Sequence, residues 1–235
     1  MCPPSKRAAR ERVVRARRAL TAAALAAGLA LGLSPAAAVD GDAPPQVTRL
    51  ALPFSGVWGV IQGFGEGTHT GYATWALDFV PAVPGGARRL PRGTPLARFP
   101  CFGAPVLAPA DGTVVRAAAG ARDWPAHIKG RGDGNFVILQ HAPHEFTEFR
   151  HLRAGSVRVA VGQRVRRGEP IGACGNSGNA ETPHVHIGFL SSVDPIATRP
   201  MTLSGYQLRN ADGSWRMAPD AASLRQGDIV RPLAW

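Results

Sequence analysis

Glycine and proline recur so often along this chain that they disfavour a helical bundle. The 235 residues include 28 glycines and 21 prolines, which divide the apolar residues into short runs. Since both residues are unfavourable inside helices and common in turns, the pattern favours a turn-rich β protein. Hydrophobic residues make up 45% of the chain, which is enough for a packed core and argues against a wholly disordered protein.

The first 38 residues have the layout of an export signal. Seven lysines and arginines precede an uncharged apolar run, residues 19–33, which is followed by the small residues Ala36, Ala37 and Ala38. This order is typical of a cleavable signal peptide, and the apolar run is shorter than the roughly 20 residues that a membrane-spanning helix needs. We therefore expect a periplasmic or secreted protein with no stable membrane span after cleavage. A retained membrane anchor is the alternative.

Much of the positive charge belongs to that segment. The whole chain has a net charge of +11, but only +5 remains when residues 1–38 are set aside. A mildly basic protein is compatible with an anionic polymer as partner and lacks the excess that is typical of DNA-binding proteins. We expect no nucleic-acid partner.

The rest of the chain divides by composition into three parts. Residues 39–49 are polar and contain prolines, which predicts a linker. Residues 50–200 predict one β-rich domain, and residues 201–235 predict a C-terminal β extension of one or two strands. Residues 106–108 and 113–117 are expected to form a hairpin across the Asp111–Gly112 turn. Other strands are expected at 56–61, 75–80, 136–140, 147–152 and 184–190.

Two cysteines, Cys101 and Cys174, lie beyond the signal segment. A disulfide between them is permitted in an exported protein, because such compartments are oxidising. Two unpaired, buried thiols are the alternative that the sequence leaves open.

His184 and His186 are separated by one residue in a segment that predicts a strand. Side chains two positions apart on a strand point to the same face, so both imidazoles share one face. One of them can then bind a metal while the other acts beside it. The turn-forming residues 175–183 that precede the pair favour this reading over two exposed histidines on an edge strand.

Asp78 is a carboxylate between two apolar residues, Leu77 and Phe79. Burying it is unfavourable unless it is paired or bound to a metal, although a hydrogen bond to a turn would also serve. His69 precedes it in a glycine-rich loop, and two histidines with one carboxylate commonly hold a catalytic zinc. His151, at the end of another expected strand, is a further candidate imidazole.

Taken in order, these residues resemble the lysostaphin-type zinc metallopeptidases, the LytM-domain endopeptidases that cleave peptidoglycan. The similarity extends from about Phe64 to Phe189 and includes residues 105–115 and 134–141. Its most specific part is the His-x-His motif after a Gly-Asn-Ser-Gly turn and Pro183. The resemblance implies an all-β fold, with a compact twisted antiparallel sheet, a lipoyl-like (duplicated hybrid motif) half-barrel and the metal in a groove.

The resemblance also implies a site. One Zn²⁺ would be bound by His69, Asp78 and His186, with His151 and His184 as the catalytic histidines. Eight residues separate His69 from Asp78, whereas three do so in the commonest motif of the family. His141 is therefore kept as an alternative donor.

The implied function is that of an exported zinc metalloendopeptidase that hydrolyses peptide bonds of peptidoglycan, in the stem peptide or the cross-bridge. We expect a monomer, and a regulatory protein partner is compatible with this reading. Two alternatives remain: a non-catalytic LytM-like regulator of cell-wall hydrolases, and a zinc D,D-carboxypeptidase. The presence of all the metal and catalytic residues argues against the regulator.

Overall fold

The computed structural model describes residues 38–39, 44–83, 90–219 and 223–233. The predicted signal segment therefore lies outside the described residues, apart from Ala38. Residues 37–235 form one compact unit, which includes the predicted C-terminal extension. The helical segments of the described residues are short 3-10 turns, and none meets the length and hydropathy of a membrane-spanning helix.

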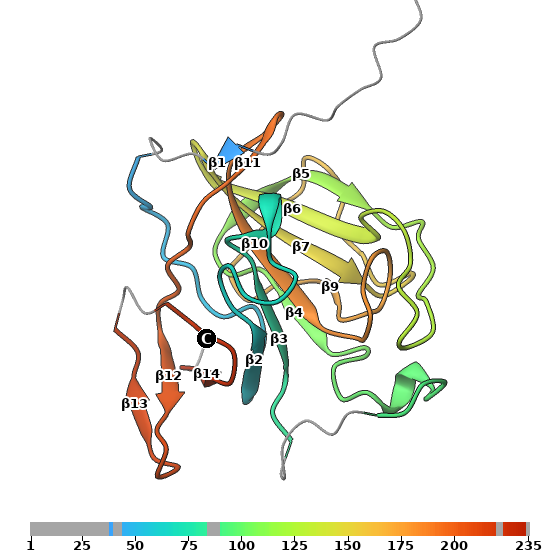
Figure 1. Cartoon of the computed structure of the whole chain (residues 1–235). Helices are drawn as coiled ribbons and strands as arrows, with labels where there is room; N and C mark the ends of the chain where they lie inside the picture. The colour runs from blue at the N-terminus through green and yellow to red at the C-terminus, as the bar shows by residue number, and fades with distance from the viewer. Residues whose placement is uncertain (1–37, 40–43, 84–89, 220–222, 234–235) are drawn as a thin grey trace, which may run out of the picture. The chain divides into compact units, whose positions relative to one another are not determined.

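One large, almost wholly antiparallel sheet dominates the described residues (Figure 1), and it confirms the predicted all-β fold class. Its main path runs in the order β13-β12-β14-β2-β3-β10-β7-β6-β5-β8, and β11 joins β10 to the short parallel strand β1. The strands of this sheet are β1 (Ala38–Val39), β2 (Trp58–Gln62), β3 (Leu77–Pro81), β5 (Gly112–Ala118), β6 (Asn135–Ala142), β7 (Glu145–Leu152), β8 (Arg164–Val165), β10 (Val185–Val193), β11 (Ile196–Thr198), β12 (Tyr206–Arg209), β13 (Trp215–Met217) and β14 (Ile229–Pro232).

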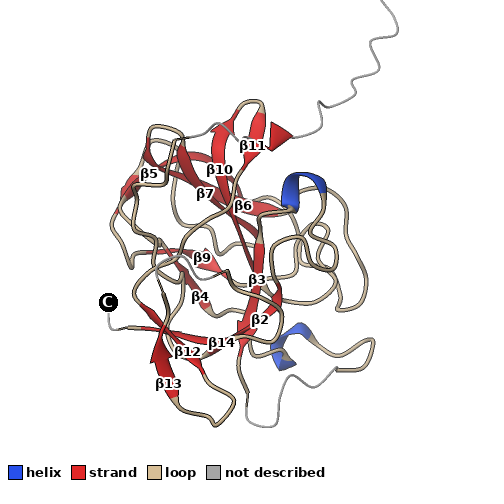
Figure 2. Cartoon of the chain, turned by 60° about the vertical axis from the view of Figure 1, so that its left-hand side comes forward, coloured by secondary structure: helices blue, strands red, loops and turns tan. Residues whose placement is uncertain are grey.

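A second, two-stranded sheet pairs β4 (Pro105–Leu107) with β9 (Pro170–Ala173). This pairing shows that the predicted hairpin is wrong, because the segment 113–117 lies in the large sheet instead, paired with β6 and β8. The Asp111–Gly112 turn is thus a corner at which the chain passes from one sheet to the other. The two 3-10 turns, η1 (Gly71–Ala73) and η2 (Leu96–Arg98), are the blue segments of Figure 2.

The main hydrophobic core lies between the two sheets, since it contains Val106 and Ile171 of the small sheet as well as residues of the large one. Leu77 and Phe79 of β3 belong to it, as do Val185, Ile187 and Phe189 of β10. Alternation along β3 and β10 then places Asp78 and His186 on the opposite face of the large sheet. The core therefore fixes which face carries the polar side chains.

A disulfide joins Cys101, just before β4, to Cys174, just after β9. Both cysteines are buried, and their Cα atoms lie 5.7 Å apart. The cysteines are separated by 73 positions, and the bond links the start of β4 to the end of β9 at one end of the small sheet. It settles the question that the sequence left open.

The described residues of the predicted linker lie against the domain. The carboxylate of Glu145 accepts hydrogen bonds from the backbone N–H groups of Val47 and Thr48, at 2.5 and 2.9 Å. The side chain of Gln46 exchanges hydrogen bonds with the backbone of Thr202. Residues 46–48 are thereby fixed to the start of β7 and to the chain after β11.

The predicted C-terminal extension contributes three strands among the described residues, β12, β13 and β14, where one or two were expected. They extend the large sheet beyond β2, because β14 pairs with β2 through Ile229–Gly59 and Val230–Trp58. Figure 1 shows the three strands gathered on the side of β2. This position brings the chain just before β14 close to the loop that carries His69.

Candidate metal centre

Four polar residues form a row across four neighbouring strands. His186 of β10 is the register partner of Asp78 on β3 and of Arg150 on β7, and Gln62 of β2 lies opposite Asp78. Residues directly opposite each other in a sheet have side chains on the same face. The sheet therefore places the four side chains together on the face away from the core.

Asp78 is the centre of this group and is 2% exposed. Its Oδ1 lies 2.9 Å from Nδ1 of His186 and 3.6 Å from Nε2 of His184. Its Oδ2 lies 3.1 Å from Nε2 of His69 and accepts a hydrogen bond of 2.7 Å from Nε2 of Gln62. Residues separated by more than a hundred positions thus converge on one carboxylate.

Backbone carbonyl groups orient three of the histidines. Nδ1 of His69 lies 2.9 Å from the carbonyl oxygen of Gly63, Nδ1 of His151 lies 2.9 Å from that of Ser177, and Nδ1 of His184 lies 2.7 Å from that of Thr182. Since a carbonyl oxygen can only accept, each Nδ1 carries the hydrogen. In the neutral form, each ring then has its lone pair on Nε2. This is the second-shell orientation that metal-binding histidines commonly have.

A β-bulge brings His151 into the site. Between the register pairs Phe149–Val137 and Leu152–Asn135, β7 has one more residue than β6. Such a bulge interrupts the alternation of side chains, and His151 has a positive φ of 60°. Arg150 and His151 consequently both line the same cavity although they are neighbours in the chain.

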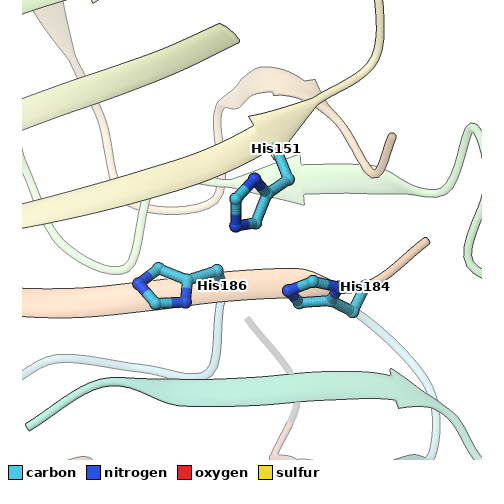
Figure 3. Close-up of side chains that lie close together, drawn as sticks. All are labelled: His151, His184 and His186. Carbon is cyan, nitrogen blue, oxygen red and sulfur yellow. The ribbon is translucent and has the colours of Figure 1, made fainter. Parts of the chain in front are cut away.

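Figure 3 shows the result. The ring of His151 reaches from the end of β7 toward His186 of β10 and His184, which directly precedes that strand. Its ring centroid is 5.0 Å from that of His184 and 5.6 Å from that of His186. The three imidazoles therefore form one cluster.

The loop that carries His69 is supported by the C-terminal part of the chain. Oε2 of Glu66 accepts hydrogen bonds from the backbone N–H of Gly63, at 2.6 Å, and from that of Gln226, at 2.8 Å. Gly63 is the residue whose carbonyl orients the His69 ring. Glu66 therefore links the segment before β14 to a histidine of the site.

These side chains line a cavity of about 580 Å³. Charged residues of both signs surround it: Lys129 and Arg150 are basic, and Asp78, Asp133 and Glu181 are acidic. Its remaining lining residues are mostly polar or small and include Gln62, Thr68, Thr70, Tyr72, Asn179, Thr182 and Gln226. The volume is that of a site for a small molecule or a short segment of a polymer.

The shared burial shifts the pKa values of the cluster in different directions. Burial alone would raise the pKa of Asp78, but the charge of His184 and the hydrogen bond from His186 hold it well below its usual value. Burial lowers the pKa of His69, yet the hydrogen bond and charge of Asp78 outweigh this and raise it. Burial, with the charges of His184 and His186, holds the pKa of His151 well below 6.5. Asp78 is thus ionised and His151 neutral near pH 7.

Two overlapping groups of side chains could hold a metal ion among the described residues. One is the predicted set His69, Asp78 and His186, and the other is His151, His184 and His186; within each set the donor atoms lie within 4.8 Å of one another. The structure therefore brings together all five residues that the sequence singled out. The alternative donor His141 lies elsewhere, because its two ring nitrogens contact the Asp111 carbonyl and the Thr147 hydroxyl.

Sequence reasoning did not single out Arg150 and its partner Glu148. Both are almost fully buried, at 5% and 1% exposed, and Nε of Arg150 lies 3.0 Å from Oε2 of Glu148. The signal was present, because two charged residues two positions apart in a strand share a face. Phe149 between them is apolar, as expected for a strand that packs against the core, and this indicates that the charged pair lies in a buried strand.

Comparison with known proteins matches residues 93–197 to peptidase family M23. The matched segment contains His151, His184 and His186, whereas His69 and Asp78 precede it. The fold therefore connects the matched segment to the two remaining residues of the cluster.

Two curated relatives are DD-peptidases by name, and one of them is named for peptidoglycan. The peptidoglycan DD-endopeptidase ShyA of Vibrio cholerae is 34% identical over 95 residues, which cover 40% of this chain and 19% of ShyA. The DD-carboxypeptidase/endopeptidase Mpg of Neisseria meningitidis is 36% identical over 121 residues, 51% of this chain and 26% of Mpg. The chain thus spans about a quarter or less of the length of these relatives.

Among solved structures, the M23 metalloprotease pseudoalterin aligns over 80% of this chain and 99% of its own, with 17% identity and a TM-score of 0.49. The match of residues 93–197 and the curated relatives confirm the lysostaphin-type resemblance. Residues 93–197 of this chain thus match peptidase family M23.

Proposed function

We propose that this protein is an exported zinc metalloendopeptidase that hydrolyses peptide bonds in peptidoglycan. One contact carries the proposal. In the neutral form of His69, Nδ1 donates to Gly63, so Nε2 bears the lone pair; this atom lies 3.1 Å from the carboxylate of Asp78. Two acceptors at this distance repel unless a proton or a cation lies between them. Nε2 of His69 is buried and has no other partner, so a metal ion is a fitting occupant.

His69, Asp78 and His186 are the proposed metal ligands. Ligand atoms around a tetrahedral zinc are separated by about 3.3 Å. The separations of 3.1 Å between His69 and Asp78 and 2.9 Å between Asp78 and His186 are close to that value. The set also contains an ionised carboxylate, which the alternative set of three histidines lacks. The donor types, two imidazoles and one carboxylate, suit a catalytic zinc with an open position.

When bound, zinc would act as a Lewis acid toward a peptide carbonyl and lower the pKa of a coordinated water. Among the residues of the chain, His184 and His151 are the proposed catalytic side chains. In the neutral form of each ring, Nε2 is the acceptor nitrogen, and both side chains line the cavity beside the proposed ligands. The low pKa of His151 keeps its ring neutral and able to accept a proton. We assign the two residues the transfer of the water proton and the stabilisation of charge that develops on the substrate oxygen.

Peptidoglycan as substrate is supported by the relatives ShyA and ShyC of Vibrio cholerae, both of which are named peptidoglycan DD-endopeptidases. Action outside the cytoplasmic membrane agrees with the signal-like order of residues 1–38. The predicted monomer, like the predicted regulatory partner, remains part of the proposal.

The test is digestion of purified sacculi by the zinc-loaded protein, with mass spectrometry of the released muropeptides. Cleavage of cross-links or of bonds within the stem peptide supports an endopeptidase. Removal of a terminal D-amino acid alone would identify a D,D-carboxypeptidase instead. A protein that binds sacculi and releases nothing, with zinc present, would be a non-catalytic regulator and would refute the proposal.

A further inference from the structure

Arg150 lies beside the proposed metal ligands and has no role in the chemistry described above. It is the register partner of His186, and its side chain lines the same cavity. An arginine that is 5% exposed is uncommon, because a guanidinium group is strongly hydrated in water. Its surroundings therefore need a specific explanation.

Glu148 fixes one side of the guanidinium group. Its Oε2 accepts hydrogen bonds from Nε, at 3.0 Å, and from Nη2, at 2.9 Å. Glu148 is 1% exposed and lies opposite Gly188 in β10. A Cβ atom at position 188 would lie 2.9 Å from Oε1 of Glu148, so the glycine leaves the space that the carboxylate occupies. The buried carboxylate of Glu148 thus fixes the orientation of the Arg150 guanidinium group.

The other side of the guanidinium group faces Asp133. Nη1 lies 2.6 Å from Oδ1 of Asp133, and the Asp133 side chain is 63% exposed. Apart from this ion pair, Nη1 is buried and has no hydrogen-bond partner. A solvated ion pair contributes little to stability, whereas a buried carboxylate such as Glu148 cannot leave its partner at low cost. Asp133 is therefore the partner that another anion can replace.

The shape of a guanidinium group selects the kind of anion. Its N–H groups form a planar fork that matches a carboxylate, and a carboxylate can accept two of them in parallel. The Tyr72 ring lies 5.3 Å from Cζ of Arg150, over the guanidinium group. Lys129 lines the same cavity and adds a second positive charge.

We propose that Arg150 binds a free carboxylate of the peptide substrate, so that the site prefers peptides in which this carboxylate is free over those in which it is amidated. The inference rests on the proposed function and adds the substrate class to it. Arg150 acts here in substrate selection. Asp133 pairs with the guanidinium group until the substrate carboxylate replaces it. Arg150 lies on the strand next to that of His186. A carboxylate bound to Arg150 would therefore lie within a residue or two of the scissile bond.

The experiment uses two cross-linked muropeptides that differ only in whether the stem-peptide carboxylates are free or amidated. Both are offered together to the zinc-loaded full chain, and the ratio of their cleavage rates gives the ratio of kcat/KM. We expect the free acid to be preferred by about tenfold or more, as for the gain of a charge-assisted hydrogen bond. Arg150→Gln should bring the ratio close to one, mainly through a higher KM, and Arg150→Lys should restore part of it.

Further variants separate substrate binding from a structural role. Arg150→Gln leaves Glu148 buried without a cation, so the double variant Arg150→Gln/Glu148→Gln is tested beside it and should lose the preference as well. Asp133→Asn keeps the Arg150–Glu148 pair and should lower KM for the free acid. Arg153→Gln is the matched control, because Arg153 is exposed and does not line the cavity. Zinc content is measured for every variant and should not change.

The outcomes distinguish this inference from the proposed function. Equal cleavage of both muropeptides by the parent, or an unchanged ratio in Arg150→Gln, overturns the role of Arg150 and leaves the peptidase intact. If neither muropeptide is cleaved, the proposed function fails. Binding of the same two muropeptides to the parent and to Arg150→Gln, measured by calorimetry, then decides the role of Arg150 separately: equal affinities overturn it.

Discussion

Asp78 of β3 and His186 of β10 are register partners, and Nδ1 of His186 lies 2.9 Å from Oδ1 of Asp78. The hydrogen bonds between the two strands set the distance between their Cα atoms, so this pair does not depend on a loop. His184, two positions earlier, lies on the same face but 3.6 Å from the same oxygen. Proteins use such rigid elements to hold catalytic groups in place.

His186 and His184 should respond differently to substitution. His186→Ala should lose zinc together with activity, whereas His184→Ala should retain zinc and lose about 10²–10⁴-fold in kcat, as for a positioned general base. His151→Ala should behave like His184→Ala. Zinc content and muropeptide release are to be measured on the same preparations. Loss of zinc from His184→Ala, or parental turnover in it, would contradict this division of roles.

Glu66 should influence zinc affinity although it does not contact the site. Glu66→Ala removes the acceptor that fixes the Gly63 N–H and Gln226 N–H, which should free the His69 loop. We expect zinc to bind about tenfold more weakly, as for the loss of one hydrogen bond to a charged group. Competition with a chelator measures the affinity. Glu66→Gln keeps a carbonyl acceptor and should lose less.

Glu169→Ala is the matched control for Glu66. Oε2 of Glu169 likewise accepts a backbone hydrogen bond, from Arg166 at 3.0 Å, but in a turn that does not line the cavity. Its substitution should leave zinc affinity unchanged. An unchanged affinity in Glu66→Ala as well would show that the His69 loop keeps its place without Glu66.

Gly178 should tolerate no side chain. Its φ is +66°, and a Cβ atom there would lie 2.7 Å from both the carbonyl oxygen of Gly132 and Cα of Gly134. Gly162→Ala is the comparison, since Gly162 also has a positive φ, +88°, but open space around it. Gly162→Ala should lower the free energy of unfolding by about 1–2 kcal/mol through backbone strain alone.

In Gly178→Ala, steric overlap should lower the free energy of unfolding by about 1–3 kcal/mol more than in Gly162→Ala. Because Ser177 precedes it and orients the His151 ring through its carbonyl group, kcat should also fall in this variant alone. Urea unfolding and activity assays measure the two effects. Equal losses of stability in the two alanine variants would refute the steric part of the argument.

The disulfide between Cys101 and Cys174 should contribute strongly to stability. In the chain-entropy description, closing a loop of this length stabilises the folded state by about 4 kcal/mol. Urea unfolding of the full chain with and without a reducing agent should show a loss of that order. The double variant Cys101→Ala/Cys174→Ala should be insensitive to the reducing agent. A parent whose unfolding midpoint ignores reduction would show that the bond does not form.

Glu145 should make stability depend on pH in the acid range. Burial would raise its pKa, but its hydrogen bonds with Thr48 and Val47 outweigh this and lower the pKa below 4.5. A lowered pKa in the folded state means that the stabilisation is complete above 4.5 and is lost as the pH falls below it. Glu145→Gln should therefore be less stable at pH 7, by about 1–2 kcal/mol.

The same variant should show a weaker loss of stability than the parent when both are acidified through that range. Urea unfolding at a series of pH values provides the comparison. Parallel curves for the parent and Glu145→Gln would show that this carboxylate is not responsible for the acid sensitivity.

Alternation along a strand was enough to predict part of the site. The apolar neighbours of Asp78 and the spacing of His184 and His186 determine which face each side chain occupies. A local rule works here because β3 and β10 are regular where these residues lie. The role of each residue toward a metal came from the family resemblance.

Alternation fails at His151. It separates neighbouring residues onto opposite faces, whereas the bulge in β7 places both Arg150 and His151 at the cavity. The extra residue is visible only once β6 is paired with β7. The incorrect prediction of a hairpin at 106–117 has a related cause. An Asp-Gly turn indicates that the chain changes direction, but the packing of the two sheets determines which strands pair.

The contact between Glu66 and Gln226, which supports the His69 loop, could not be predicted from local sequence, since the two residues are 160 positions apart. That separation has a consequence for the order of events during synthesis. A ribosome adds about 5–20 residues per second, so Glu66 waits roughly ten to thirty seconds for Gln226 to be made. Once His186 has been made, the chain contains all five residues of the cluster, but the last hydrogen bond that fixes the His69 loop still awaits Gln226, 40 positions further on. If the site binds zinc as proposed, it can reach its full affinity only after nearly all of the sequence has been translated.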